Sequence, residues 1–136
     1  MATTSEQVAL ALDYVQGKRR TERVLQAADA LLDRYGDESD PQRRVHLAYE
    51  LIRRNFAENV TVEYDGTEYR SGTDEPAGGE LRYTARLTGP NGEPGTLSAG
   101  YTPPGSLGLT GPEWLAAMRL FSRIAALGTG GRAICP

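Results

Sequence analysis

Apolar residues recur every three or four positions over the first 35 residues, which is the spacing of one face of a helix. The positions that share this spacing are Val8, Ala11, Leu12, Val15, Val24, Leu25, Ala28, Leu31, Leu32 and Tyr35. They predict one long helix, or two helices with a break near Gly17. A second helix is predicted to begin at Asp40 and Pro41, because aspartate suits an N-cap and proline suits the first helical position. Two amphipathic helices therefore open the chain.

The spacing changes to alternation after residue 59, which is typical of half-buried strands. The alternating stretches are residues 60–65, 67–71, 81–87 and 96–101. Asp65 and Gly66 are a strong hairpin signal, and a two-residue turn there pairs Tyr64 with Thr67. The Gly- and Pro-rich residues 89–95 predict the turn of a second hairpin. The pattern therefore predicts four antiparallel strands in two hairpins.

A third helix is predicted to begin at Thr110, whose spacing to Glu113 fits a capping box, and to end at Gly128. The order helix, helix, four strands, helix is that of an α+β domain. We expect residues 1–128 to form this single domain, with the three helices packed on one face of the sheet and the other face open to water. The Gly-rich residues 129–136 are expected to be a flexible tail.

The segment 81–127 resembles the end of a GAF domain, and more broadly a GAF, PAS or profilin-like α+β module. The matching residues are Gly95-Thr96-Leu97, in the fourth strand, and the helix over 113–127. The interval between the second and third strands, residues 72–80, is too short for the helices that usually enclose a GAF ligand. The resemblance implies a shortened sensory or regulatory module that often dimerises through its first and last helices.

Composition narrows the classes of function further. The chain has 136 residues, a formal net charge of −3 and a pI of about 5.2, which disfavours nucleic acid or a membrane surface as a partner. One cysteine and one histidine exclude an internal disulfide, a Cys-based zinc site and a His-rich metal site. We therefore expect no metal and no cofactor. The apolar stretches are shorter than a membrane span and no apolar signal core is present, which favours a cytoplasmic protein.

Apolar residues on the first and last helices exceed what one small domain can bury. Those expected in a homodimer contact are Val8, Leu12, Val15, Leu115, Leu120 and Leu127. A leftover apolar stripe on a helix usually finds a partner. The leading hypothesis is a non-catalytic regulatory module that acts through dimerisation and through binding of a protein partner.

A second hypothesis is a domain that binds a small molecule or cofactor. Arg82 and Arg86, with Glu63 and Ser98, could bind an anion on the polar sheet face. An apolar cavity could instead be lined by Tyr83, Tyr101 and Trp114. The simpler interpretation is a solvated sheet face in the first case and ordinary core packing in the second.

A third hypothesis is a carrier or precursor whose tail, Gly-Gly-Arg-Ala-Ile-Cys-Pro over 130–136, is processed or modified, with Cys135 as the candidate for modification. His46 has Glu50 one turn away, which fits a pair on the helix surface as well as a catalytic base. The common nucleophile, phosphate-loop and metalloprotease motifs are absent from the sequence. We therefore expect no catalytic residues.

Overall fold

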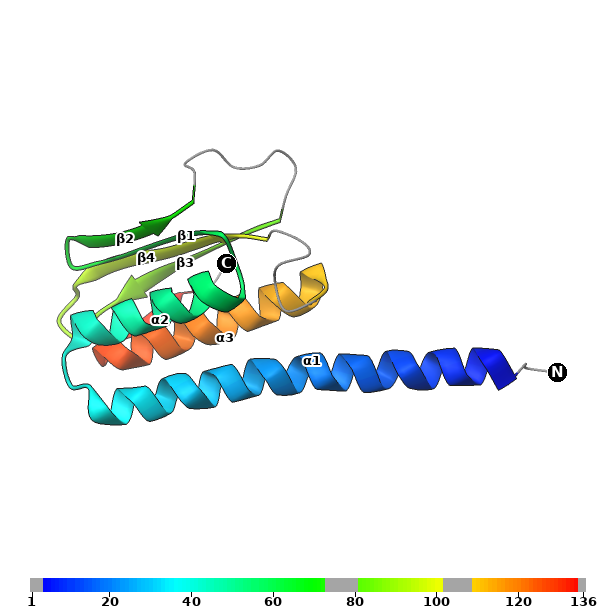
Figure 1. The fold of residues 1–136 in the computed structure, drawn as a ribbon. Coiled ribbons are helices and arrows are strands. Elements are labelled where there is room, and N and C mark those ends of the chain that lie inside the picture. The colour runs from blue at the N-terminus through cyan, green and yellow to red at the C-terminus, as the bar shows by residue number, and fades with distance from the viewer. Residues whose placement is uncertain (1–3, 73–80, 102–108, 135–136) are drawn as a thin grey trace.

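The computed structural model describes residues 4–72, 81–101 and 109–134, and they form an α+β fold of three helices and one antiparallel sheet (Figure 1). The elements in chain order are α1 (Thr4–Asp37), α2 (Pro41–Asn55), β1 (Asn59–Tyr64), β2 (Thr67–Ser71), β3 (Arg82–Thr88), β4 (Pro94–Gly100), α3 (Gly111–Thr129) and β5 (Arg132–Ile134). The first predicted helix is continuous through Gly17. The predicted capping box of α3 is present, because Thr110 and Glu113 exchange both hydrogen bonds.

The sheet has the strand order β2-β1-β4-β3-β5. The predicted turn joins β1 and β2, since Asp65 and Gly66 both have positive φ angles, of 50° and 85°, as a hairpin turn of this kind requires. The register pairs Tyr64 with Thr67, which confirms the prediction. β4 lies between β1 and β3, so the two hairpins form one continuous sheet.

The sheet has five strands, whereas four were predicted. The additional strand, β5, lies within the segment 129–136 that was predicted to be a tail, and it pairs with the end of β3. Gly130 ends α3 in the left-handed conformation and turns the chain back toward the sheet. Gly131 then passes so close to β3 that a Cβ atom there would overlap the carbonyl oxygen of Thr88. A three-residue strand is too short to give an alternating pattern, which explains why it escaped the sequence analysis.

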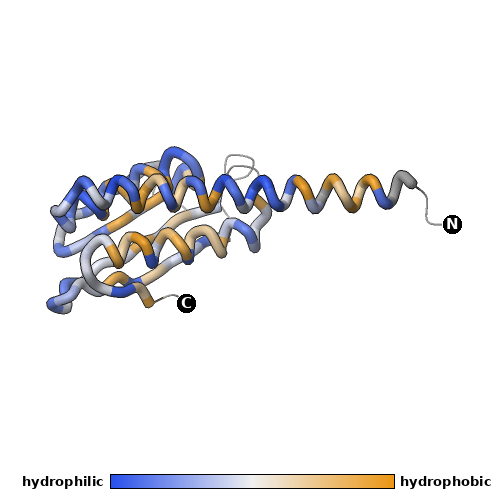
Figure 2. The backbone as a smooth tube through the Cα atoms, turned by 90° about the horizontal axis from the view of Figure 1, so that it is seen from below, coloured by the Kyte–Doolittle hydropathy of each residue, from blue (hydrophilic) through white to orange (hydrophobic). Residues whose placement is uncertain are grey.

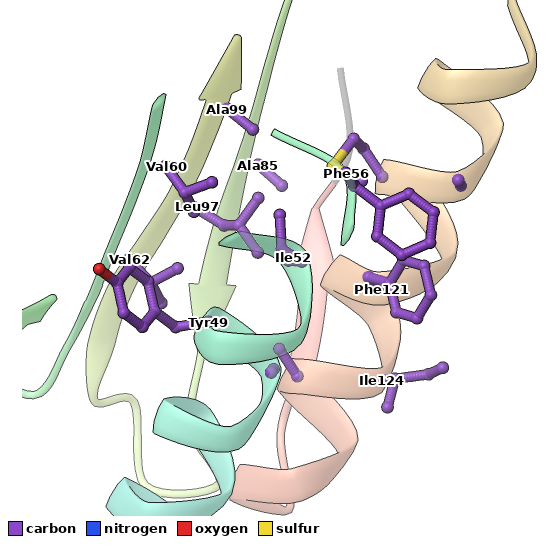
Figure 3. Close-up of a cluster of buried hydrophobic side chains, with 14 of the residues drawn as sticks. Tyr49, Ile52, Phe56, Val60, Val62, Ala85, Leu97, Ala99, Phe121 and Ile124 are labelled. Carbon is purple, nitrogen blue, oxygen red and sulfur yellow. The ribbon is translucent and has the colours of Figure 1, made fainter. Parts of the chain in front are cut away.

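Three layers make up the molecule. α2 and α3 cover the apolar face of the sheet, and α1 packs on both of them as the outermost layer (Figure 1). Figure 3 shows the core between sheet and helices, where Ile52 of α2 points toward Leu97 of β4 and Phe56 lies beside Phe121 of α3. The ring centroids of Phe56 and Phe121 are 4.9 Å apart. The opposite face of the sheet carries the polar side chains of the strands, as expected.

Arg44 ties the three helices together at one end of this arrangement. Its guanidinium donates to the carbonyl oxygens of Glu38, Tyr35 (2.7 Å) and Gly128 (3.4 Å). The Tyr35 ring packs on Gly128, where an added Cβ would come within 2.9 Å of the ring. The junction fixes the end of α1 against the end of α3.

α1 and α3 run parallel, and α1 begins well before α3. Arg20 of α1 pairs with Glu113 of α3, 93 positions later, and Tyr35 meets Gly128 at the same separation. In this register the first residue of α3, Gly111, lies level with Lys18. Residues 4–17 therefore extend beyond the body of the molecule (Figures 1 and 2).

Candidate functional site

The most unusual surface is the part of α1 that extends beyond the body, residues 4–17, which we call the projecting half of α1. At 1.5 Å per residue it is ~20 Å long. Its large apolar side chains are exposed by 41–72%, and they are Val8, Leu10, Leu12, Tyr14 and Val15. Figure 2 shows this apolar stretch outside the body. A run of exposed large apolar side chains is typical of surfaces that bind a partner.

The apolar residues of the projecting half form two rows on opposite sides of the helix. Leu10 and Tyr14 continue the side on which α1 meets the body further along, because Val24 follows Leu10 at a separation of two heptads. We call these two residues the inner row. Val8, Leu12 and Val15 lie on the other side, and we call them the outer row. A helix that is apolar on both sides is normally buried by other helices.

The structure does not bring the six predicted dimer residues into one patch. Val8, Leu12 and Val15 lie on the projecting half, whereas Leu127 is exposed near the opposite end of the helical layer, next to Gly128. Leu115 and Leu120 are half-buried against the core. The sequence analysis missed Leu10 and Tyr14. Their signal was present in the heptad spacing of 10, 14, 17, 21, 24, 28, 31 and 35.

An apolar groove of about 250 Å³ lies between α1 and α3, just past the base of the projecting half. Its lining residues are Thr21, Val24, Leu25, Leu109, Glu113, Ala116, Ala117 and Leu120. The ion pair of Arg20 Nε with Glu113 Oε1, at 2.9 Å, joins the two walls of the groove. The backbone N–H of Thr110, and then Arg20, lower the pKa of Glu113. The one carboxylate of the groove is thus already paired within the chain.

The predicted anion site lies on the polar face of the sheet. Arg82 Nε donates to Ser98 Oγ at 3.1 Å, so these two residues are together. Arg86 and Glu63 both stand opposite Thr96 of β4, one on each side, and they line a shallow hollow of about 240 Å³. The hollow carries charges of both signs, and both charged side chains, Glu63 and Arg86, are exposed to solvent, as in the simpler interpretation of a solvated face.

Of the aromatic residues predicted to line a cavity, Tyr83 and Trp114 lie in the core, and Tyr101 is partly buried against it. Trp114 is fully buried and donates to the carbonyl oxygen of Phe56 at 2.8 Å. The Tyr83 hydroxyl lies 2.8 Å from Ser122 Oγ, and the Tyr101 hydroxyl donates to the Leu109 carbonyl at 2.6 Å. Their polar groups are therefore used in holding α3 to the sheet and to the chain around it.

His46 lies half-exposed on α2, with Nε2 3.7 Å from Glu50 Oε1 and its ring 4.8 Å from that of Tyr69. Glu50 also pairs with Arg53 and Arg54, and the hydrogen bond from Arg53 is the main cause of its lowered pKa. This is a network of charges on a helix surface. Cys135 lies outside the described residues.

Within the described residues, acidic, histidine and cysteine side chains form no group that could hold a metal ion. None of the described helices combines the length and the apolar character needed to cross a bilayer.

No protein-family model matches the chain, and neither a curated protein nor a solved structure matches it. The candidate site is thus defined by the geometry of this chain, and it is the projecting half of α1 with the groove beside its base.

Proposed function

We propose that this chain is a non-catalytic regulatory module that acts by forming a homodimer and by binding a protein partner. The observation that carries the proposal is the projecting half of α1, which exposes Leu10 and Tyr14 by 71% and 72%, and whose described side chains are not part of the buried core. Removing such a surface from water favours association by about 25 cal/mol for each Å² of apolar area.

The regulatory part of the proposal is supported by the resemblance of residues 81–127 to the end of a GAF domain. In this proposal the helices pack on the sheet in a GAF-like manner. The 72–80 interval is too short for the helices that usually enclose a GAF ligand, so the proposed module acts without that ligand enclosure. The exposed polar side chains of the sheet, among them Arg82 and Arg86, remain accessible to a protein partner.

The test compares the full chain with a variant that lacks residues 1–15. The described side chains removed are exposed, so the shortened chain should fold to the same circular dichroism spectrum. Native mass spectrometry and light scattering should then show a dimer for the full chain and a monomer for the shortened one.

The matched control is Ile134→Asp, which places a charge at an exposed apolar residue of β5, away from α1. This variant should remain dimeric. A full chain that is monomeric at micromolar concentration, or a shortened chain that is still dimeric, would refute the proposal.

A further inference from the structure

The spacing of residues along α1 is symmetric about the peptide bond between Gly17 and Lys18. Leu10 and Leu25 are equally far from this bond, and so are Tyr14 and Thr21. These four residues lie on one side of the helix. Two copies of such a helix can pack in antiparallel fashion about a two-fold axis, since each residue of the first half then meets its counterpart in the partner's second half.

The groove between α1 and α3 lies where this packing needs it. Leu25 and Thr21 form part of its wall, and they are the positions that would meet Leu10 and Tyr14 of a second copy. Ala116 and Leu120 form the facing wall on α3. An incoming helix would therefore touch α1 on one side and α3 on the other.

The lengths also agree. The projecting half ends where α3 begins, and α3 then flanks α1 from Lys18 onward in the register set by the Arg20–Glu113 pair. In the antiparallel packing, residues 4–17 of one copy lie alongside residues 18–31 of the other. The projecting half of one copy thus lies against the part of the partner's α1 that has the α1–α3 groove beside it.

The chemistry of the two surfaces is complementary. The groove is almost entirely apolar, and its carboxylate, Glu113, is already paired with Arg20. Gly17 and Lys18 lie at the crossing point, where a glycine lets the two helices approach closely. The large apolar side chains that each copy would bury in the contact include Leu10, Tyr14 and Leu25, which are exposed by 71%, 72% and 56% in the single chain.

Resting on the proposed dimer, we propose that its two chains cross antiparallel at Gly17 and Lys18, and that the projecting half of each lies in the α1–α3 groove of the other. The inner row, Leu10 and Tyr14, enters the groove. The outer row, Val8, Leu12 and Val15, remains on the outside of the dimer.

Cross-linking tests the antiparallel direction. In a Cys135→Ser background, chains carrying Leu10→Cys are mixed with chains carrying Leu25→Cys and treated with a short bismaleimide. A cross-linked heterodimer is expected. Leu10→Cys chains alone should give no cross-linked dimer, because their two cysteines would lie ~22 Å apart along the helices. Efficient cross-linking of Leu10→Cys to itself would show a parallel arrangement and overturn the inference.

Paired substitutions test which row enters the groove. Leu10→Asp should weaken dimerisation about a hundredfold or more, because an aspartate would enter an apolar groove. Leu12→Asp, two positions away on the outer row, should stay dimeric. Ala116→Arg should dissociate the dimer from the groove side, whereas Gln26→Arg, on the exposed outer face of α1, should not.

These outcomes separate the two proposals. A dimer that survives Leu10→Asp or Ala116→Arg, or that dissociates with Leu12→Asp alone, would overturn the antiparallel groove contact. The proposed dimer function would remain in that case. A full chain that is monomeric would overturn both.

Discussion

Tyr35 is a buried residue whose hydroxyl has no hydrogen-bond partner among the residues that the structure describes. Burial raises the pKa of this hydroxyl well above its usual value, and the nearby Arg44 opposes that rise only in part. The ring itself is useful, because it fills the space left by Gly128 and lies under the Arg44 guanidinium at 5.6 Å. The packing of Tyr35 and the burial of its polar atom therefore act in opposite directions on stability.

Tyr35→Phe should keep the packing and remove the buried hydroxyl. An unpaired buried polar group costs about 1–3 kcal/mol, so the variant should be as stable as the parent or more stable by up to ~1 kcal/mol. Urea unfolding followed by circular dichroism measures this. Tyr35→Leu is the matched variant that loses the ring, and it should be destabilised. A clear loss of stability in Tyr35→Phe would show that the hydroxyl has a partner.

At the scale of elements, Glu113 has two roles at the start of α3. Its carboxylate accepts from the backbone N–H of Thr110 at 2.9 Å, and it pairs with Arg20 of α1. The first contact caps α3 and the second holds α1 against it. Both favour the ionised form, which is why the pKa of this carboxyl lies below its usual range in the folded protein.

The lowered pKa predicts the direction of a pH effect. The stabilisation by Glu113 is fully present above the unfolded-state pKa of about 4.3, and it is lost as the pH falls through the lower folded-state pKa. The parent should therefore be more stable than Glu113→Gln at neutral pH, and the difference should shrink in acid. Unfolding free energies at several pH values measure it. Arg20→Gln should show a smaller effect, because the Thr110 contact remains. A difference independent of pH would contradict the prediction.

β5 turns the end of the chain into part of the sheet. Deleting residues 132–136 removes the pairing of Arg132 and Ile134 with β3 and exposes the edge of that strand. The loss of a few ladder bonds and of Ala133 packing should destabilise the fold by about 1–2 kcal/mol. Ile134→Ser, at an exposed position of the same strand, should have little effect in the same unfolding assay. An unchanged unfolding midpoint after the deletion would contradict the role of β5.

The sequence predicted elements whose signal is local. The β1–β2 turn was predictable because aspartate and glycine tolerate the positive φ angles at positions 65 and 66. The α3 capping box was predictable because both partners lie within one turn. β5 was not, since its position depends on how Gly130 redirects the chain toward β3. The groove was not predictable either, because it needs the register between α1 and α3, which residues 93 positions apart determine.

On the scale of the whole molecule, the extension of α1 beyond the body is the reason to expect a dimer in solution. The apolar spacing of the sequence predicted Val8, Leu12 and Val15 as dimer residues, whereas the antiparallel packing proposed above places them on the outside of the dimer. The sequence could not show that α3 begins level with Lys18 and leaves residues 4–17 without a neighbour in the body. That fact depends on packing between helices far apart in the chain.

A homodimer should be stabilised by mass action. The melting temperature of the full chain should therefore rise with protein concentration, because only folded chains associate. The chain that lacks residues 1–15 should melt at a temperature independent of concentration. Thermal unfolding over a hundredfold range of concentration measures both. Equal concentration dependence in the two chains would place the association elsewhere.

The two edges of the sheet carry features that discourage pairing between the sheets of different copies. Within the described residues, β2 pairs on one side only, and its outward-facing side chains include Glu68 and Arg70, whose charges pair at 2.6 Å. At the other edge, β5 pairs with the end of β3 from Arg86 to Thr88, and β3 begins at the charged Arg82. Charged side chains and short edge strands discourage the edge-to-edge stacking that leads to aggregation. The protein can thus present an apolar helix for association while its sheet resists uncontrolled growth.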